Sequence, residues 1–348
     1  MCIVHKGFTG FRAVSPASIS GGNLTGLKPE IPYDTIHSTL AVIVRMTRNI
    51  AILFGAGASY GAGSILPERP PLGNQLFLEL QRLYPNSWGT ITEDLKSAFL
   101  ENFELGMKMI WDNYSHSVAP LMQNMSEYFI QFRPVNNASL YCELIKKLAS
   151  IQKLESVSFT SLNYDIILEL SLLNNGFNIN YFSPESEVLK EIEVLKIHGS
   201  SNFMGTEIYG GKGISYGAGV TFNGGIKATL DSSEVIENYL VQSGIAPVMS
   251  LYMEGKPVNV SPQIIAGLQE TYKIRCTEAK AIVVIGVRPI MADKHIWDTI
   301  TSAKGVVYYV GSTADLSTLK EARKSVVHLG EYFNTSFNNI INCIYETN

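Results

Sequence analysis

A cluster of glycines follows the first strongly apolar run of the sequence. Residues 50–54 are all apolar, which is typical of a parallel strand buried on both faces. The loop at residues 55–63 follows directly, and Gly55 and Gly57 form a Gly-x-Gly pair at its start. Such a pair lets the backbone approach a pyrophosphate at a helix N-terminus, although Tyr60 replaces the third glycine of the usual fingerprint. We expect a phosphate group to bind here; a tight strand-to-helix turn is the alternative.

Three polar residues follow two later predicted strands. Asn163 and Asp165 come just after the strand predicted at residues 156–160, and His198 follows the strand at residues 193–197. Because the carboxyl ends of parallel strands meet at one edge of a sheet, we expect these side chains beside the glycine loop. Taken singly, the first two would serve as helix caps and the histidine as a structural residue. Their shared edge favours an active site.

The pattern of the chain predicts the scaffold that positions these residues. Apolar runs alternate with amphipathic segments, which favours an α/β fold with a doubly wound parallel sheet. Beyond the strands already named, strands are predicted at residues 281–286 and 306–310. Helices are predicted at residues 166–173, 263–276, 294–302 and 314–324.

The chain divides into an extension and a catalytic domain. Residues 1–47 lack sustained periodicity and form the predicted extension, whereas residues 48–348 form the domain. Helical spacing through residues 73–150 predicts a helical insertion, with helices at 76–83, 99–111 and 140–148. Residues 201–262 are rich in Gly, Ser and aromatics, and we expect loops and short strands over a cleft there.

Composition narrows the classes of function. The 348 residues allow about two domains or one large α/β domain, and the net charge of −4 comes without basic runs, so nucleic-acid binding is not expected. The four cysteines lack C-x-x-C spacing, so we expect no metal. The apolar runs are too short for a membrane span, and we expect a cytoplasmic protein.

Three motifs, in order, resemble those of the sirtuin superfamily. Residues 54–59 are similar to its G-A-G-x-S loop, residues 161–165 to its T-x-N-x-D element and residues 196–200 to its K-x-H-G-S element. The resemblance covers residues 48–312 and implies a Rossmann-like, sirtuin-type fold that binds NAD as substrate. It places the dinucleotide against the loop residues and a strand-end glycine, namely Gly55, Ala56, Gly57, Ser59 and Gly286.

The departures from the superfamily point to one branch of it. Deacetylating sirtuins have a four-cysteine zinc ribbon, whereas here only Cys276 lies between His198 and residue 342. Leu162 replaces the glutamine before the asparagine, and residues 67–71 replace an Asp-Phe-Arg run. The N-Y-D form, the missing ribbon and the helical insertion resemble the sirtuin-like effectors of bacterial antiphage defence. This resemblance implies an NAD hydrolase that depletes the cell's NAD.

The expected reaction assigns a role to each polar residue. Breaking the nicotinamide-ribose bond builds positive charge on the ribose, while nicotinamide leaves as a neutral molecule. We expect Asn163 to bind the ribose or the attacking water, and Asp165 to fix the carboxamide or stabilise the cation. His198, with an ordinary pKa of about 6.5, would accept the proton. Ser59 would donate to a phosphate oxygen.

Other functions and partners stay open at this point. The same activated ribose supports an ADP-ribosyl transferase or a protein deacylase, and a non-catalytic NAD or nucleotide sensor is a further alternative. A dehydrogenase is disfavoured because no acidic residue is evident at a strand end about 20 residues after the glycine loop. Continuous NAD loss would harm the cell, so we expect control by a homo-oligomer or a separate regulatory or sensor protein. The extension and the insertion are candidate contact surfaces.

Overall fold

The protein is built around one parallel sheet. The computed structural model describes residues 48–114, 117–182, 191–207, 220–241, 244–251 and 257–347, so the predicted extension at 1–47 lies outside the described residues. Seven strands pair in the order β11-β10-β9-β1-β4-β6-β5, and every pairing among them is parallel. The strands are β1 (Ile50–Phe54), β4 (Val157–Ser161), β5 (Asn178–Asn180), β6 (Glu191–Leu195), β9 (Ala281–Ile285), β10 (Val306–Val310) and β11 (Val326–Gly330).

Strand β1 lies at the centre of the sheet. It is buried along its whole length and pairs in register with β4 on one side and β9 on the other. The chain first adds β4, β5 and β6 on one side of β1, with β6 between β4 and β5, and then adds β9, β10 and β11 on the other side. The strand order therefore reverses beside β1, which is where ligands bind in open α/β sheets.

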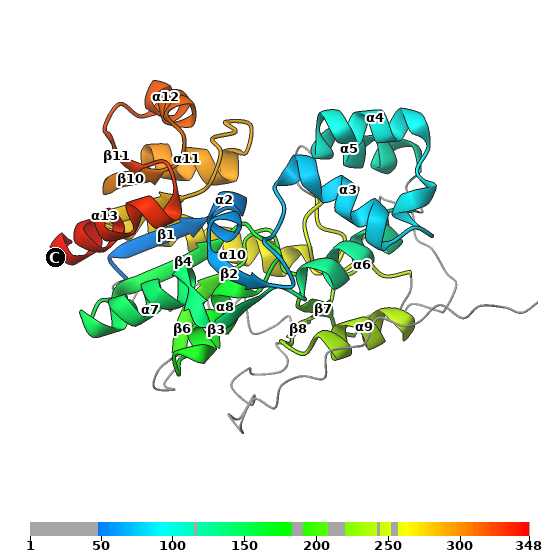
Figure 1. The fold of residues 1–348 in the computed structure, drawn as a ribbon, viewed down its shortest axis with the longest axis horizontal. Coiled ribbons are helices and arrows are strands. Elements are labelled where there is room, and N and C mark those ends of the chain that lie inside the picture. The colour runs from blue at the N-terminus through cyan, green and yellow to red at the C-terminus, as the bar shows by residue number, and fades with distance from the viewer. Residues whose placement is uncertain are drawn as a thin grey trace, which may run out of the picture.

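Helices cover both faces of this sheet. On one face, α7 (Leu140–Ser150) contacts α8 (Ile167–Asn174) and α13 (Phe333–Glu346). On the other face, α10 (Pro262–Glu278) contacts β1, β6 and α11 (Lys294–Ser302) (Figure 1). The connection α12 (Thr313–Ala322) joins β10 to β11. The predicted α/β, doubly wound parallel fold is confirmed.

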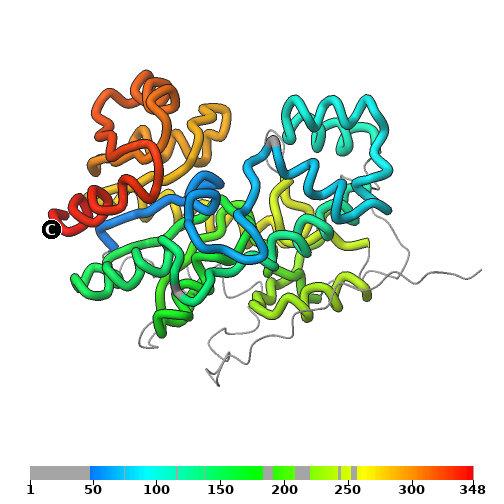
Figure 2. The backbone as a smooth tube through the Cα atoms, in the orientation of Figure 1, coloured from blue at the N-terminus to red at the C-terminus, as the bar shows by residue number. Residues whose placement is uncertain are grey.

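The predicted insertion forms a lobe of its own. Four helices, α3 (Gly73–Leu83), α4 (Glu93–Glu101), α5 (Phe103–Asn113) and α6 (Val118–Phe129), lie between β2 (Gly63–Leu66) and β3 (Arg133–Ser139). Figure 2 shows α3, α4 and α5 on the side of the molecule away from the C-terminal elements. Aromatic side chains fill the lobe: Phe77, Trp88, Phe99 and Phe103. These rings pack on one another, and they belong to the same apolar core as the buried strands of the sheet.

Two details of the helical prediction are wrong. The helix predicted at 99–111 is two helices, because Asn102 takes an extended conformation and its side chain accepts a hydrogen bond from the Glu104 amide. The turn lets the Phe99 ring lie directly on Gly106, where a β-carbon would be 2.3 Å from the ring. The segment at 133–139 is a strand that pairs with β2. Helix α7 is not part of the insertion but packs with α8 and α13 on one face of the sheet.

The second half of the chain adds elements that the sequence pattern did not predict. Short strands β7 (Phe203–Gly205) and β8 (Ile226–Ala228) confirm part of the prediction for residues 201–262, whereas α9 (Ser232–Val241) is a helix in the same segment. Strand β11 and helix α13 were also missed. Within the described ranges, no helix combines the length and the apolar character that crossing a bilayer requires.

Candidate active site

The glycine loop contacts the backbone that follows β9. Strand β1 ends at Phe54, and the short helix α2 (Ala56–Tyr60) begins one residue later. The amides of Gly55 and Gly57 donate to the carbonyls of Ile285 and Gly286, each at 3.0 Å. Gly286 has a φ of +65°, and a β-carbon there would lie 2.2 Å from the Ala58 nitrogen. The glycines allow the two loops to touch. The amides of Gly55 and Gly57 therefore bind backbone carbonyls, and not the phosphate that the sequence predicted for them.

Asn163 joins this loop to the end of β4. Its Nδ2 donates to the Gly55 carbonyl and to Ser59 Oγ, both at 2.9 Å. Ser59 Oγ lies 3.1 Å from the Tyr141 hydroxyl, so the network continues into α7. The side chain of Asn163 thus contacts the glycine loop, and the expected neighbourhood of Gly55, Ser59 and Asn163 is what the structure shows.

Asp165 lies deeper than the other predicted residues. Its side chain is buried, and Oδ1 accepts a hydrogen bond from the Ile167 amide at the first residue of α8. This contact corresponds to the helix-cap alternative. Burial raises the pKa of the Asp165 carboxyl, and the charge of Lys196 opposes that shift. The structure therefore shows Asp165 as a buried carboxyl at the start of α8 and not as an exposed group.

A buried lysine connects the motifs at the ends of β4 and β6. Lys196 Nζ donates to the Asp165 carbonyl at 2.6 Å and lies 3.2 Å from Glu169 Oε1, with both side chains fully buried. Burial raises the pKa of Glu169, and Lys196 opposes the rise. Tyr181 donates to the same carboxylate at 3.4 Å. Glu169 and Tyr181 were not predicted as part of the site, because acidic residues within apolar helical patterns carry no distinct spacing signal.

His198 is held by a tight turn at the end of β6. The next residue, Gly199, has a φ of +75°, and a β-carbon there would lie 2.0 Å from the Val248 carbonyl oxygen. The carbonyl of His198 accepts from the Ser250 amide at 2.8 Å. With 6% of its surface exposed, His198 places Nε2 2.9 Å from Nε2 of His295 in the first turn of α11. His295 was missed, although it opens a predicted helix after a predicted strand.

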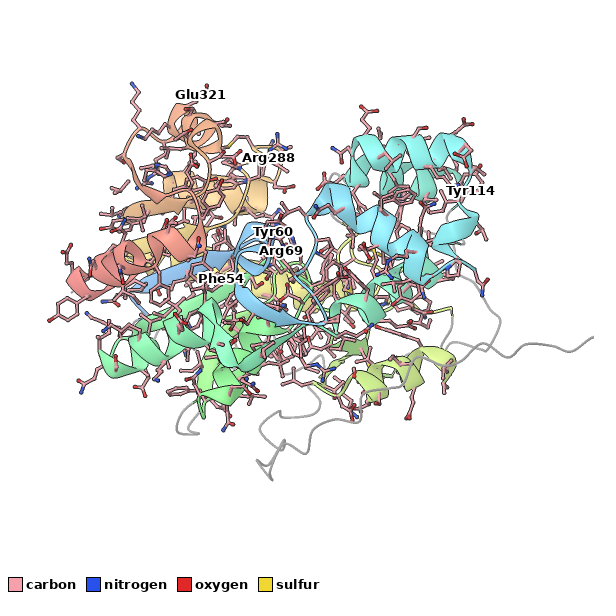
Figure 3. All side chains as sticks on the ribbon, in the orientation of Figure 1. Phe54, Tyr60, Arg69, Tyr114, Arg288 and Glu321 are labelled. Carbon is pink, nitrogen blue, oxygen red and sulfur yellow. The ribbon has the colours of Figure 1, made fainter. Side chains whose placement is uncertain are left out.

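Arginines lie on the loops that flank the glycine loop. The guanidinium of Arg69 lies 3.9 Å above the centre of the Tyr60 ring. Figure 3 shows Tyr60 and Arg69 together near the middle of the molecule, with Arg288 beyond them. Arg288 follows Gly286 by two residues, is largely exposed and lies 3.9 Å from Asp315. Both arginines can pair with a phosphate through two parallel hydrogen bonds.

The described His, Cys, Asp and Glu side chains were compared with the arrangement that a metal ion needs. In the ranges that the structure describes, no group of three or more His, Cys, Asp and Glu side chains is placed to hold a metal ion. The cysteines described, Cys142, Cys276 and Cys343, are free and buried. Burial raises the pKa of Cys276 to about 12.

Comparisons with known proteins show similarity in structure. No family model matches the chain, and no curated protein matches it. The structure is similar to that of a histidine-to-tyrosine mutant of Sir2 with a p53 peptide and NAD, at a TM-score of 0.37 and 12% identity. The similarity covers 89% of this chain and 97% of that one.

Proposed function

We propose that the chain binds NAD at the carboxyl edge of its sheet and hydrolyses the nicotinamide-ribose bond. The observation that carries this proposal is the bridge from Asn163 to Gly55 and Ser59 on the edge where His198 also lies. The bridge fixes a polar amide between two strand ends beside the point where the strand order reverses. Hydrolysis releases nicotinamide and ADP-ribose.

The chemistry requires a base, a ribose contact and stabilised positive charge. Since Nδ2 of Asn163 donates to the loop, the proposal assigns its Oδ1 to the ribose hydroxyls or to the attacking water. His198 accepts the proton of that water. Asp165, buried behind Asn163, stabilises the oxocarbenium-like charge through its field, which acts strongly in a site of low dielectric.

The phosphates need positive charge beyond the loop amides. Gly55 and Gly57 already donate to the β9 loop, and Ser59 is hydrogen-bonded within the network. In the proposed complex the dinucleotide still lies next to Ala56, Ser59 and Gly286. We propose that Arg69 and Arg288 bind the negatively charged pyrophosphate, since their side chains are exposed beside the loop.

Nicotinamide release from NAD tests this proposal directly. We expect the wild-type protein to release nicotinamide, and Asn163→Ala and His198→Ala each to lower kcat about 10²- to 10⁴-fold. His328→Gln is the matched control, because that histidine lies on β11 and contacts the Gly311 carbonyl. Full activity in both site variants would contradict the assigned roles.

Product analysis separates water from other acceptors. Hydrolysis leaves free ADP-ribose, whereas a transferase leaves a modified acceptor whose mass rises accordingly. Tight NAD binding without turnover would favour the sensor alternative. Incubation should be carried out with the protein alone and with products of neighbouring genes, since the proposal includes control by oligomerisation or a separate sensor protein.

The antiphage role is the most specific part of the proposal, and it rests on the sequence resemblance. If the chain is such an effector, phage infection of bacteria that express it should lower cellular NAD. Cells that express His198→Ala should keep their NAD under the same infection. A wild-type strain whose NAD stays constant throughout infection would contradict this role.

A further inference from the structure

Two histidines from different parts of the chain meet at the proposed site. His198 follows β6, and His295 lies in the first turn of α11, after β9. Their Nε2 atoms are 2.9 Å apart, the ring centres are 5.1 Å apart, and the planes are inclined by 54°. His198 is buried, whereas His295 is half-buried. The contact spans the two halves of the sheet that meet at β1.

The contact between the two rings limits the number of protons that they can hold. A neutral imidazole has one nitrogen that donates and one that accepts, so one proton lies between the two Nε2 atoms. Two doubly protonated rings would point two N–H groups at each other, which this contact excludes. The pair therefore holds at most one added proton while the contact persists.

We propose that His295 is a positioning residue for the reaction assigned to His198, an inference that rests on the proposed function. His295 accepts a hydrogen bond from Nε2 of His198, which sets the orientation of the His198 ring. Because His295 touches the base, it acts through His198. The same arrangement of base and orienting partner occurs in other hydrolytic sites, where the partner is usually a carboxylate.

The step balances in protons and electrons. The O–H bond of water breaks, its proton bonds to the ring of His198, and its electron pair stays on the oxygen that bonds the ribose C1. The bond between C1 and the nicotinamide nitrogen breaks, and its electrons neutralise the pyridinium. The added proton later leaves the pair for solvent, so one NAD and one water give nicotinamide, ADP-ribose and one proton.

Burial explains why His198 needs such a partner. With 6% of its surface exposed, the His198 ring has little contact with water and depends on protein atoms for its hydrogen bonds. An acceptor at 2.9 Å from Nε2 supplies one of these bonds and shares the charge of the added proton with a ring closer to solvent. Both rings have anchored backbones: the Ser250 amide donates to the His198 carbonyl, and the Thr299 hydroxyl donates to the His295 carbonyl.

Kinetics of three variants test the proposal. We expect His295→Ala to lower kcat for nicotinamide release about 10²-fold, with KM for NAD nearly unchanged, since the base loses its orientation while NAD contacts stay. His295→Gln should recover much of the rate, because its Oε1 can accept from Nε2 of His198. His328→Gln is the control and should behave as wild type. A kcat in His295→Ala equal to or above wild type would overturn the proposal.

A spectroscopic measurement separates failure of this inference from failure of the proposed function. In protein with ¹⁵N-labelled histidine, His295→Ala should shift the ring nitrogen signals of His198, because it removes the partner of Nε2, and His328→Gln should leave them in place. Nicotinamide release together with unmoved His198 signals would overturn the inference alone. Moved signals without any nicotinamide release would overturn the proposed function, and the role of His295 with it. Urea unfolding confirms that each variant is folded.

Discussion

Two buried charged clusters lie along β6, one within the strand and one just past its end. Within the strand, Glu193 is held by Arg275 through two hydrogen bonds of 3.0 and 2.8 Å, with Arg48 3.8 Å away. Past the end, Lys196 lies between Glu169 and the backbone of Asp165. The first cluster has two cations for one carboxylate, whereas the second has one cation for two.

This difference in charge balance separates a structural cluster from one beside the proposed chemistry. Burial alone would raise the pKa of Glu193, but Arg48 and Arg275 outweigh it and the pKa is lowered. For Asp165 and Glu169 burial prevails over Lys196, and their pKa values are raised. Perturbed acids of this kind cluster at functional sites. An excess of buried carboxylate also suits a reaction that develops positive charge nearby.

The largest expected effect comes from removing a cation of the Glu193 cluster. Arg275→Met should lower the free energy of unfolding by about 3–5 kcal/mol, because it leaves a buried carboxylate without its two-point partner. Urea denaturation measures this loss. The activity of the folded fraction should match wild type, since the cluster lies within the strand and away from its carboxyl edge.

The matched control for this prediction is an exposed pair on the same helix. Lys273 and Glu270 contact each other at 3.6 Å with more than two fifths of each side chain exposed. Lys273→Met should change stability by no more than about 0.5 kcal/mol. A loss below about 1 kcal/mol in Arg275→Met would contradict a structural role for the Glu193 cluster.

The Lys196 cluster should respond differently to the same kind of change. Lys196→Met should cost about 2 kcal/mol, less than Arg275→Met, because acids with raised pKa values can take up a proton instead of staying charged and unpaired. It should also lower kcat for nicotinamide release, since Lys196 holds the Asp165 carbonyl. Equal stability losses with full activity in both variants would remove the distinction between the clusters.

Much of the scaffold could be predicted from the sequence because its strands are short apolar runs bounded by turns. Predicted and observed bounds agree at β1, β10 and α11, where burial on both faces or a strong amphipathic pattern leaves one interpretation. Strand β3 was taken for helix because its pairing with β2 is a tertiary contact. Helix α9 was missed because it lies in a Gly- and Ser-rich segment of weak periodicity.

The site was predictable where a residue directly follows a strand. Gly55, Asn163, His198 and Gly286 each lie within three residues of the carboxyl end of a strand, and the parallel topology brings such positions to one edge of the sheet. The use of the Gly55 and Gly57 amides was not predictable, since it depends on how closely the β9 loop approaches. Nor was Glu169, a helix residue whose partners lie on two other elements.

The smallest effect in this series concerns the pH dependence of stability. The pKa of Glu169 is raised in the folded protein, so its contribution to stability is fully present below the unfolded-state pKa of about 4.3 and is lost as pH rises through the folded-state value. Glu193 has a lowered pKa and the opposite sign: its contribution is present at neutral pH and is lost as pH falls.

Glu169→Gln isolates the first of these contributions. Its amide oxygen can still accept from Lys196 and Tyr181, but it cannot ionise, so the variant should lose less stability than wild type between pH 5 and pH 7. The expected result is the direction of this difference, because the raised pKa makes ionisation of Glu169 costly only in folded wild type. Urea denaturation at both pH values measures it, with the exposed Glu270→Gln as control. If the stability of wild type and Glu169→Gln changes in parallel, folding does not disfavour the ionised form of Glu169. The two clusters along β6 would then not differ in how they treat a buried carboxylate.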